Sequence, residues 1–291
     1  MNKNLKKILY WVLIALFSII FIVSAVFVVK YIIDSRQSQE AISGVQDMYS
    51  KPTWSSLHTR PATNPGTTGT IPPLTSLPVP GTLPPTQPPT DPTDSTGSNG
   101  MLPDLEAMYN LNNDVVGYIY VEDTNINYPV LHHPSEKDYY LYRDLYGNED
   151  RHGSVYVREA CDVFKPSDNV TIYGHNMADG TMFAHLHRYK REDFFNSHSI
   201  IYFDTLYERH AYQVVCVFRT SGTYGVGFPF HLYDNFKDEA EFKEFISTAR
   251  DLAIFDSGIS VEYGDKFICL STCEDWPIKN GRLVVLAVRI A

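Results

Sequence analysis

The sequence predicts a mainly β domain, a barrel or sandwich of about eight strands, which follows one transmembrane helix and a proline-rich stalk. Three observations lead to this fold class. An uninterrupted apolar run lies near the N-terminus, prolines cluster in the next segment, and short runs of Val, Ile, Tyr and Phe recur between turn signals after residue 100. These three parts of the 291-residue chain differ so much that each is considered separately.

The N-terminal apolar segment is long enough to cross a membrane. Residues 8–29 are 22 residues without a charge, and at ~1.5 Å per residue they span a hydrocarbon core of ~30 Å. Lys3, Lys6 and Lys7 precede this segment, which favours a cytoplasmic N-terminus (residues 1–7) and an extracellular C-terminal part. The alternative is a cleaved secretory signal, but its apolar region is normally only ~7–15 residues long. We therefore expect a single-pass anchor in the cell membrane.

Residues 30–100 form the expected extracellular stalk. Of the 18 prolines, 13 fall between Pro52 and Pro103, interleaved with Thr, Ser and Gly. Proline fixes φ and removes a backbone donor, so this composition favours an extended, solvated chain without a packed core. At up to ~3 Å per residue, about 50 residues of such a chain would place a domain more than ~100 Å from the bilayer. The composition also permits O-glycosylation.

Residues 101–291 are long enough for one sizeable core and carry most of the negative charge. The first 40 residues carry +3 and residues 41–100 carry −1, which leaves −12 for the rest out of the total of −10. This charge excludes a strongly basic nucleic-acid binder and disfavours docking on anionic lipid or polymer.

Eight strands and several helices are predicted in this domain. The strands are expected at residues 116–121, 126–130, 154–157, 169–173, 200–203, 212–219, 266–271 and 283–290. Asp238 followed by Glu241 resembles a capping box, and it precedes a helical apolar pattern formed by Phe242, Phe245, Ile246, Ala249 and Leu252. This helix should pack on the sheet. Shorter helical segments are expected at residues 104–112, 182–189 and 192–196.

The domain contains four cysteines, Cys161, Cys216, Cys269 and Cys273. This number is sparse for an external domain, so we expect no obligatory disulfide. Cys216 and Cys269 lie inside apolar runs, which is typical of small buried side chains. Cys273 follows the strand at 266–271 and precedes a loop, where a reactive thiol is both held in place and accessible.

Arg282 is predicted to lie beside Cys273. A loop of eight residues, 274–281, separates the two, and if the flanking strands pair as a hairpin the two side chains come close together. A positive charge there favours the thiolate and stabilises an oxyanion on a carbonyl that the thiolate attacks. The pair alone leaves open the alternative of a solvent-facing arginine at the hairpin edge.

Among the ten histidines, His175 has the position that suits a catalytic partner. It follows the predicted buried strand at 169–173, and Gly174 permits a sharp turn between them. His185 and His187 are two residues apart on a predicted helix and do not share a face, so we expect no metal site there. Cys269 and Cys273 straddle a strand end, which also argues against a zinc pair.

Two motifs give the sequence a resemblance to the sortase family, class B most closely. One is Leu270-Ser271-Thr272-Cys273 with Arg282 nine positions further on, and the other is Tyr173-Gly174-His175-Asn176-Met177 with Gly180 and Met182-Phe183. The resemblance covers essentially all of residues 101–291. It implies an eight-stranded sortase-type β-barrel with an N-terminal helix and a long helix inserted before the last two strands.

The resemblance also implies a function. It is that of a cysteine transpeptidase on a Gram-positive surface, which cleaves the C-terminal sorting signal of secreted proteins and transfers the acyl group of a Cys thioester to a cell-wall or peptidoglycan amine. Without an amine acceptor the implied activity is that of a hydrolase. Cys273 would be the nucleophile, His175 the general acid/base, and Arg282 the oxyanion or substrate-orienting residue, with Arg289 as a weaker rival.

The resemblance further implies where substrate binds. Ser271 and Thr272 would line the substrate groove, Asn176 and Glu274 would contact substrate beside them, and the loop at 221–230 would lie near the cleft. It implies no cofactor, no metal and no calcium.

Three alternatives remain. One is a pilus-assembly sortase that uses a pilin lysine. Another is a secreted cysteine protease, although papain-like enzymes place Cys before His in the chain. The last is a non-catalytic adhesion or sensor domain on a stalk.

Overall fold

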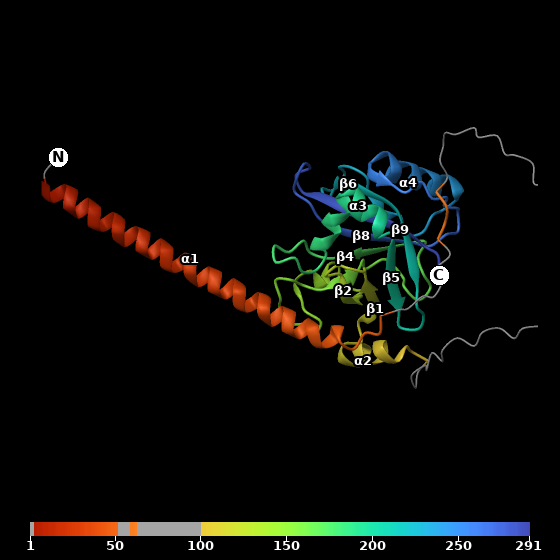
Figure 1. Cartoon of the computed structure of the whole chain (residues 1–291), viewed down its shortest axis with the longest axis horizontal. Helices are drawn as coiled ribbons and strands as arrows, with labels where there is room; N and C mark the ends of the chain where they lie inside the picture. Colours follow the sequence, from red (N-terminus) through yellow and green to blue (C-terminus); the bar gives the residue numbers. More distant parts are fainter. Residues whose placement is uncertain (1–2, 52–58, 63–99) are drawn as a thin grey trace, which may run out of the picture.

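The computed structural model describes residues 3–51, 59–62 and 100–291. Figure 1 shows a long N-terminal helix that projects from a β domain. In chain order the elements are α1 (Lys3–Gln46), α2 (Pro103–Leu111), β1 (Val115–Tyr120), β2 (Asn127–Leu131), η1 (Tyr139–Tyr142), β3 (Val155–Val157), β4 (Asn169–Tyr173), η2 (Ala184–Lys190), α3 (Glu192–Ser197), β5 (Ile200–Thr205), β6 (Ala211–Ser221), η3 (Phe230–Leu232), α4 (Glu239–Asp251), β7 (Ala253–Asp256), β8 (Phe267–Cys273) and β9 (Gly281–Arg289).

Eight of the nine strands in the described part of the chain form a closed barrel. Their order is β5-β1-β2-β3-β4-β8-β9-β6, and β6 pairs with β5 to close it. The β2–β3 and β4–β8 pairs are parallel and the others are antiparallel. The expected β-barrel is therefore confirmed, and each of the eight predicted strands lies within two residues of its predicted bounds.

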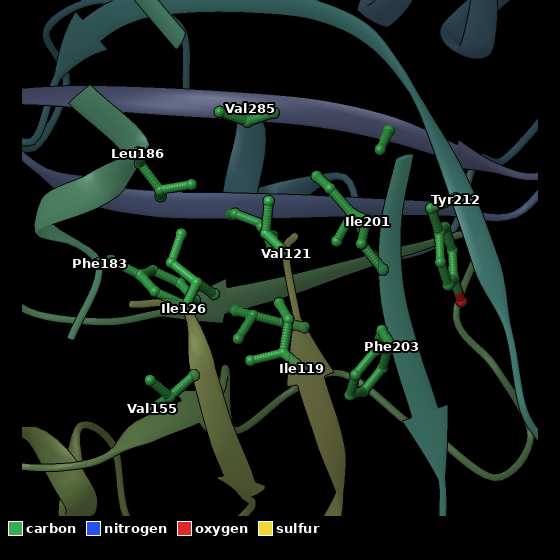
Figure 2. Packing of buried hydrophobic residues seen from close by; sticks show 14 of the residues in the cluster. Ile119, Val121, Ile126, Val155, Phe183, Leu186, Ile201, Phe203, Tyr212 and Val285 are labelled. Carbon is green, nitrogen blue, oxygen red and sulfur yellow. The ribbon is translucent and has the colours of Figure 1, made fainter. Parts of the chain in front are cut away.

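The barrel interior is filled by apolar side chains from all around the sheet. Figure 2 shows Ile119 and Val121 from the β1 side facing Ile201 and Phe203 of β5 and Val285 of β9. A second apolar cluster lies between α4 and the outer face of β6, β8 and β9. Because β8 and β9 are buried on both faces, the two strands that end at the predicted site are held rigidly.

Helix α4 begins and packs as its sequence predicts. The Asp238 side chain accepts a hydrogen bond from the backbone N–H of Glu241 at 2.9 Å, which caps the helix. Phe242, Phe245, Ile246 and Ala249 are buried against the sheet. The inserted helix before β8 and β9 is therefore present.

Truncation of the α4 apolar face should destabilise the domain. Phe245 is fully buried, so Phe245→Ala is expected to lower the free energy of unfolding by about 3–5 kcal/mol. Leu252 belongs to the same predicted apolar pattern but is 41% exposed, so Leu252→Ala should cost about 1 kcal/mol or less. Denaturant unfolding of both variants measures the difference, and equal losses would contradict this packing.

Strand β7 was not predicted. It follows α4 directly, contains four residues and pairs only with β6, outside the closed barrel. Its residues Ala253, Ile254 and Phe255 continue the apolar character of the helix without a turn residue between them. A strand that begins in this way has no sequence signal of its own.

Helix α1 has the length and composition needed to cross a membrane. It contains an 18-residue window with a mean hydropathy of 3.2, and none of that window is buried against the protein. The helix does not end at residue 29, where the apolar run ends, but continues to Gln46.

The last part of α1 packs on the domain and does not belong to a stalk. One side of the last part of α1 is buried, at Ser35, Ser38 and Val45. Tyr49, just beyond the helix, is buried as well. Val45 and Tyr49 join an apolar cluster with α2 and β1. The stalk expected at residues 30–100 therefore differs from the structure over residues 35–49, because these residues have buried partners that their sequence does not reveal.

A second attachment occurs at residues 59–62. Arg60 forms an ion pair with Asp265 at 2.6 Å, and Ala62 forms a β-bridge with Ile259. The next residue that packs on the domain in the described part of the chain is Met101, which is buried in the cluster with α2 and β1. The extended conformation was predicted for the proline-rich stretch between Pro52 and Pro103. Most of this stretch, residues 52–58 and 63–99, lies outside the described residues, so its conformation stays a prediction.

A buried histidine joins α1 to the domain. The His152 ring lies between two carboxylates, with Nδ1 at 3.1 Å from Asp150 and Nε2 at 3.0 Å from Asp179. Ser38 of α1 donates to Asp150, and Ser35 donates to Asp179 at 2.6 Å. We call Ser35, Ser38, Asp150, His152 and Asp179 the α1 joint.

The protonation of His152 makes the α1 joint sensitive to pH. The hydrogen bond to Asp150 raises the pKa of His152 above its ordinary 6.5, burial opposes this, and Asp179 adds to the rise. Burial raises the pKa of Asp179, but hydrogen bonds from Ser35, Thr181 and His152 outweigh it and hold that pKa well below its ordinary value. The contribution of His152 to stability is therefore complete below pH ~6.5 and is lost as the pH rises through the raised pKa.

We expect His152→Gln to lower the free energy of unfolding by about 2 kcal/mol below pH ~6.5, and by progressively less at higher pH. The matched control is His231→Gln, because burial lowers the pKa of His231 and gives its contribution the opposite pH dependence. Denaturant unfolding across the pH range measures both. A His152→Gln loss that does not change with pH would contradict the proposed protonation of the joint.

Candidate active site

Cys273 and Arg282 lie opposite each other on the β8–β9 hairpin, as the sequence predicts. They are directly paired in the antiparallel register, so their side chains leave the same face with Cβ atoms ~5 Å apart. A Cβ atom placed on Gly222 would lie 2.7 Å from the guanidinium carbon of Arg282, so this glycine leaves the space that the guanidinium occupies. Arg282 also donates to the Gly281 carbonyl at 3.0 Å. The cation is thus held in place at the end of the hairpin that carries Cys273.

His175 lies at the same edge of the barrel as Cys273, because β4 and β8 are parallel neighbours. The Gly174 backbone N–H donates to the Ser271 carbonyl at 3.2 Å, and the Thr272 hydroxyl donates to the Gly174 carbonyl at 2.8 Å. These bonds continue the strand pairing to the residues just before His175 and Cys273. The ends of β4, β8 and β9 therefore bring together the three predicted catalytic residues.

The tautomer of His175 follows from its hydrogen bond. Nε2 lies 2.7 Å from the Leu141 carbonyl oxygen, which can only accept, so Nε2 carries the proton. Burial lowers the pKa of His175, the Leu141 bond opposes this, and His152 lowers it further. The resting imidazole is therefore neutral near pH ~7, and Nδ1 is the nitrogen left to accept a proton. The Tyr142 ring lies 5.4 Å from the His175 ring and covers part of it.

The backbone of Cys273 is held by two side chains. Asn176 Nδ2 donates to the Cys273 carbonyl at 3.3 Å, and His187 Nε2 donates to the same oxygen at 3.2 Å. From the sequence, His187 was considered only as a metal ligand, so this role was not predicted. The helical periodicity of the region carries no signal for a contact with a strand 86 residues away.

Glu274, the residue after Cys273, is buried and paired with two cations. Its carboxylate lies 2.5 Å from Lys190 and 2.8 Å from Arg219. Burial raises the pKa of Glu274, but hydrogen bonds from Arg219 and Lys190 outweigh it, so the pKa lies below its ordinary value. These partners occupy the carboxylate that the sequence analysis assigns to substrate.

Ser271 and Thr272 face the protein rather than an open groove. They are only 1% and 2% exposed, and the Thr272 hydroxyl already donates to Gly174. The Ser271 hydroxyl is buried and has no hydrogen-bond partner within the described part of the chain. Of the four residues expected to contact substrate, Asn176 has an exposed side chain, and the substrate role of all four stays a prediction.

Arg289, the weaker rival of Arg282, lies at the other end of β9. It is paired with Tyr212 and is seven residues from Arg282, or ~23 Å along the strand. The loop predicted near the cleft does lie beside Arg282, since Gly222 packs against the guanidinium and donates to the Asn280 carbonyl at 2.8 Å.

Cys273 is the one partly exposed cysteine, and all four are free thiols. Burial raises the pKa of Cys161, Cys216 and Cys269 and keeps these three thiols protonated. Cys216 and Cys269 are buried among apolar residues, as expected. The reactive position at this edge therefore belongs to Cys273.

The two histidines weighed as a metal site have separate partners. His185 Nδ1 accepts the Asn125 N–H at 2.9 Å, whereas His187 binds the Cys273 carbonyl. Within residues 3–51, 59–62 and 100–291, no three His, Cys, Asp or Glu side chains are grouped as a metal ion requires. The expected lack of a cofactor stays a prediction.

Comparison with known proteins identifies the architecture. The sequence profile of the family described as Sortase domain matches residues 119–290. Sortase B of Staphylococcus aureus is 28% identical over 188 residues, which cover 65% of this chain and 75% of the relative. Sortase B of Listeria monocytogenes is 28% identical over 193 residues, which cover 66% and 76%.

Solved structures agree with this result. Sortase B of Bacillus anthracis in complex with AAEK1 has a TM-score of 0.64 and 25% identity, and the match covers 89% of this chain and 99% of that one. A Staphylococcus aureus sortase B–substrate complex has a TM-score of 0.59 and 29% identity, with 65% and 86% covered.

Proposed function

The chain belongs to the sortase family, class B, and from this we propose that it is a membrane-anchored transpeptidase that joins secreted proteins to a cell-wall amine. Its substrate would be the C-terminal sorting signal of a secreted protein. The observation that carries the proposal is the convergence of His175, Cys273 and Arg282 at the ends of three neighbouring strands. We assign α1 as the anchor, with a cytoplasmic N-terminus and an extracellular β domain.

The proposed reaction begins with attack by Cys273. Its Sγ bonds to a backbone carbonyl carbon of the sorting signal while Nδ1 of neutral His175 takes the thiol proton. The negative charge that develops on the carbonyl oxygen lies next to the guanidinium of Arg282. The C–N bond then breaks, His175 gives its proton to the leaving amine, and a thioester remains on Cys273.

The second half transfers the acyl group. An acceptor amine attacks the thioester carbonyl, His175 removes a proton from that amine, and the Cys273 sulfur leaves and is reprotonated. Attack by water instead of the amine would give hydrolysis. The hydrogen bonds of Asn176 and His187 to the Cys273 carbonyl keep the nucleophile in position in both steps.

Intact-mass measurement tests this proposal. The full chain in detergent is incubated with a panel of sorting-signal peptides, with Cys273→Ala alongside. A mass gain equal to the N-terminal part of one peptide, absent in the variant, is the expected result. Triglycine and Nα-acetyl-lysine are then added separately, and release of an acyl-triglycine product favours wall anchoring over a pilin-type acceptor. An inert Cys273 that neither peptides nor iodoacetamide modify would reject the enzyme and favour a stalked adhesion domain.

A further inference from the structure

Helix α1 meets the domain at the point where its apolar segment ends. Residues 10–30 are exposed, Tyr31 directly after them is half-buried, and Ser35 of the α1 joint is buried. Tyr31 is two residues beyond Val29, or ~3 Å along the helix axis. When residues 8–29 span a bilayer, the domain therefore begins at the level of the lipid headgroups.

One residue of the α1 joint is also close to His175 in the sequence. Asp179, which binds Ser35 at 2.6 Å, is four residues after His175. Ser35 is six residues beyond Val29, or ~9 Å along the axis. The loop that follows His175 is consequently fastened to the helix within a short distance of the membrane.

The charges around this level suit lipid phosphates. Lys30, Arg36 and Arg151 are exposed there, and the Arg151 guanidinium lies 5.0 Å from the centre of the Tyr31 ring. Although residues 101–291 are acidic as a whole, Lys30 and Arg36 lie on α1 just beyond the apolar segment and Arg151 contacts Tyr31 there. Helix α1, which is part of the same chain, holds the domain at the bilayer, so the overall negative charge does not have to attract it.

Two loops beside Arg282 carry exposed apolar side chains. Tyr224 is 99% exposed, Val226 56% and Trp276 82%. The loops are joined because Gly222 donates to the Asn280 carbonyl at 2.8 Å. In Figure 1 the blue loop between β8 and β9 projects on the side toward which α1 extends. Aromatic side chains in such a position are typical of a membrane–water interface.

We propose that the face carrying His175, Cys273 and Arg282 rests on the bilayer, with α1 as the rigid support and Tyr224, Val226 and Trp276 in the headgroup region. The proposal depends on the membrane anchoring given under Proposed function. It means that the site accepts polypeptide and amine groups presented at the membrane surface. It also means that the proline-rich segment does not set the height of the domain, because Ala62 and Met101, on either side of residues 63–99, both contact the domain.

Quenching of Trp276 tests the contact. The chain has three tryptophans, so Trp11→Phe with Trp54→Phe leaves Trp276 as the single emitter. The full chain is reconstituted in phosphatidylcholine/phosphatidylglycerol vesicles whose acyl chains carry bromine close to the headgroup. We expect a clear loss of Trp276 emission relative to unbrominated vesicles. Unquenched emission would overturn the proposal and favour a protein or peptide as the partner of these loops.

A matched control moves the tryptophan to another face. Tyr263 is 48% exposed and lies four residues after Ile259. Ile259 pairs with Ala62, which belongs to the short orange segment on the side of the domain away from α1 in Figure 1. In a chain with Tyr263→Trp and Trp276→Phe added to the other two substitutions, bromolipids should leave emission unchanged. Equal quenching at both positions would indicate non-specific adsorption and overturn the proposal.

Insertions separate the role of α1 from that of the proline-rich segment. Ten Gly/Ser residues between Lys30 and Tyr31 should reduce Trp276 quenching, whereas the same ten residues between Gly81 and Thr82 should leave it at the parent value. The reverse pattern would overturn the role of α1 as the support.

The readout is independent of catalysis. Quenching without a thioester would reject the proposed function and keep the membrane contact, and a thioester without quenching would do the opposite.

Discussion

Replacement of Cys273 by alanine is expected to abolish both thioester formation and acyl transfer, with a fall in kcat/KM of at least about 10⁴-fold. The reason is that Sγ forms the covalent bond on which both halves of the reaction depend, and none of the other thiols can replace it. Cys161, Cys216 and Cys269 are buried, and burial raises the pKa of each. Product release from a sorting-signal peptide, followed by chromatography, measures the loss.

The matched control is Cys216→Ala, which removes a buried thiol on β6 and leaves the site untouched. It should retain activity in proportion to the folded protein and still incorporate one iodoacetamide per chain. Cys273→Ala should incorporate none in the native state. Labelling of native Cys273→Ala at another cysteine would show that the thiols differ less in accessibility than the structure indicates.

Replacement of Arg282 by alanine is expected to lower kcat/KM by about 10²–10³-fold, the usual cost of losing one oxyanion-stabilising donor. The guanidinium lies opposite Cys273 in the hairpin register and is fixed against Gly222. Arg282→Lys should recover only part of the activity, since lysine keeps the charge but not the planar fork of donors. Single-turnover acylation rates separate this effect from weaker peptide binding.

Arg289→Ala provides the comparison on the same strand. Arg289 is paired with Tyr212 at the opposite end of β9, so its loss should leave kcat/KM near the wild-type value. Thermal unfolding of both variants verifies that each is folded. Similar losses of activity in the two variants would mean that Arg282 acts through the stability of β9 rather than through the reacting carbonyl.

The strands could be predicted because the sequence of the domain alternates between short apolar runs and turn residues. Asn169–Tyr173 was predicted with the bounds that the structure shows, and the predicted hairpin pairs Cys273 with Arg282 as the structure does. The parallel pairing of β4 with β8, which brings His175 to Cys273, is a long-range contact that local patterns do not encode. The resemblance to sortases, rather than spacing, supplied that link.

The parts that were missed depend on partners far apart in the chain. Ser35 and Ser38 look like polar residues after a membrane span, and only the folded domain supplies Asp150 and Asp179 as their partners. In the same way, Thr272 is buried and donates its hydroxyl to the carbonyl of Gly174, the residue that follows the neighbouring strand β4. Composition predicted a spacer from residue 30, whereas tertiary contacts extend the folded region back to the end of the apolar segment.

The distribution of the four cysteines determines how this enzyme would respond to oxidants. Reversible oxidation first gives a sulfenic acid, which a nearby thiol normally resolves to a disulfide. Cys269, the nearest cysteine in the chain, is four residues away on the same strand, so its Cα lies ~13 Å from that of Cys273, beyond the ~7 Å limit for a disulfide. The other two are buried. Oxidised Cys273 therefore depends on a thiol from outside the protein to restore it, and the redox state of the surroundings sets the fraction of active enzyme.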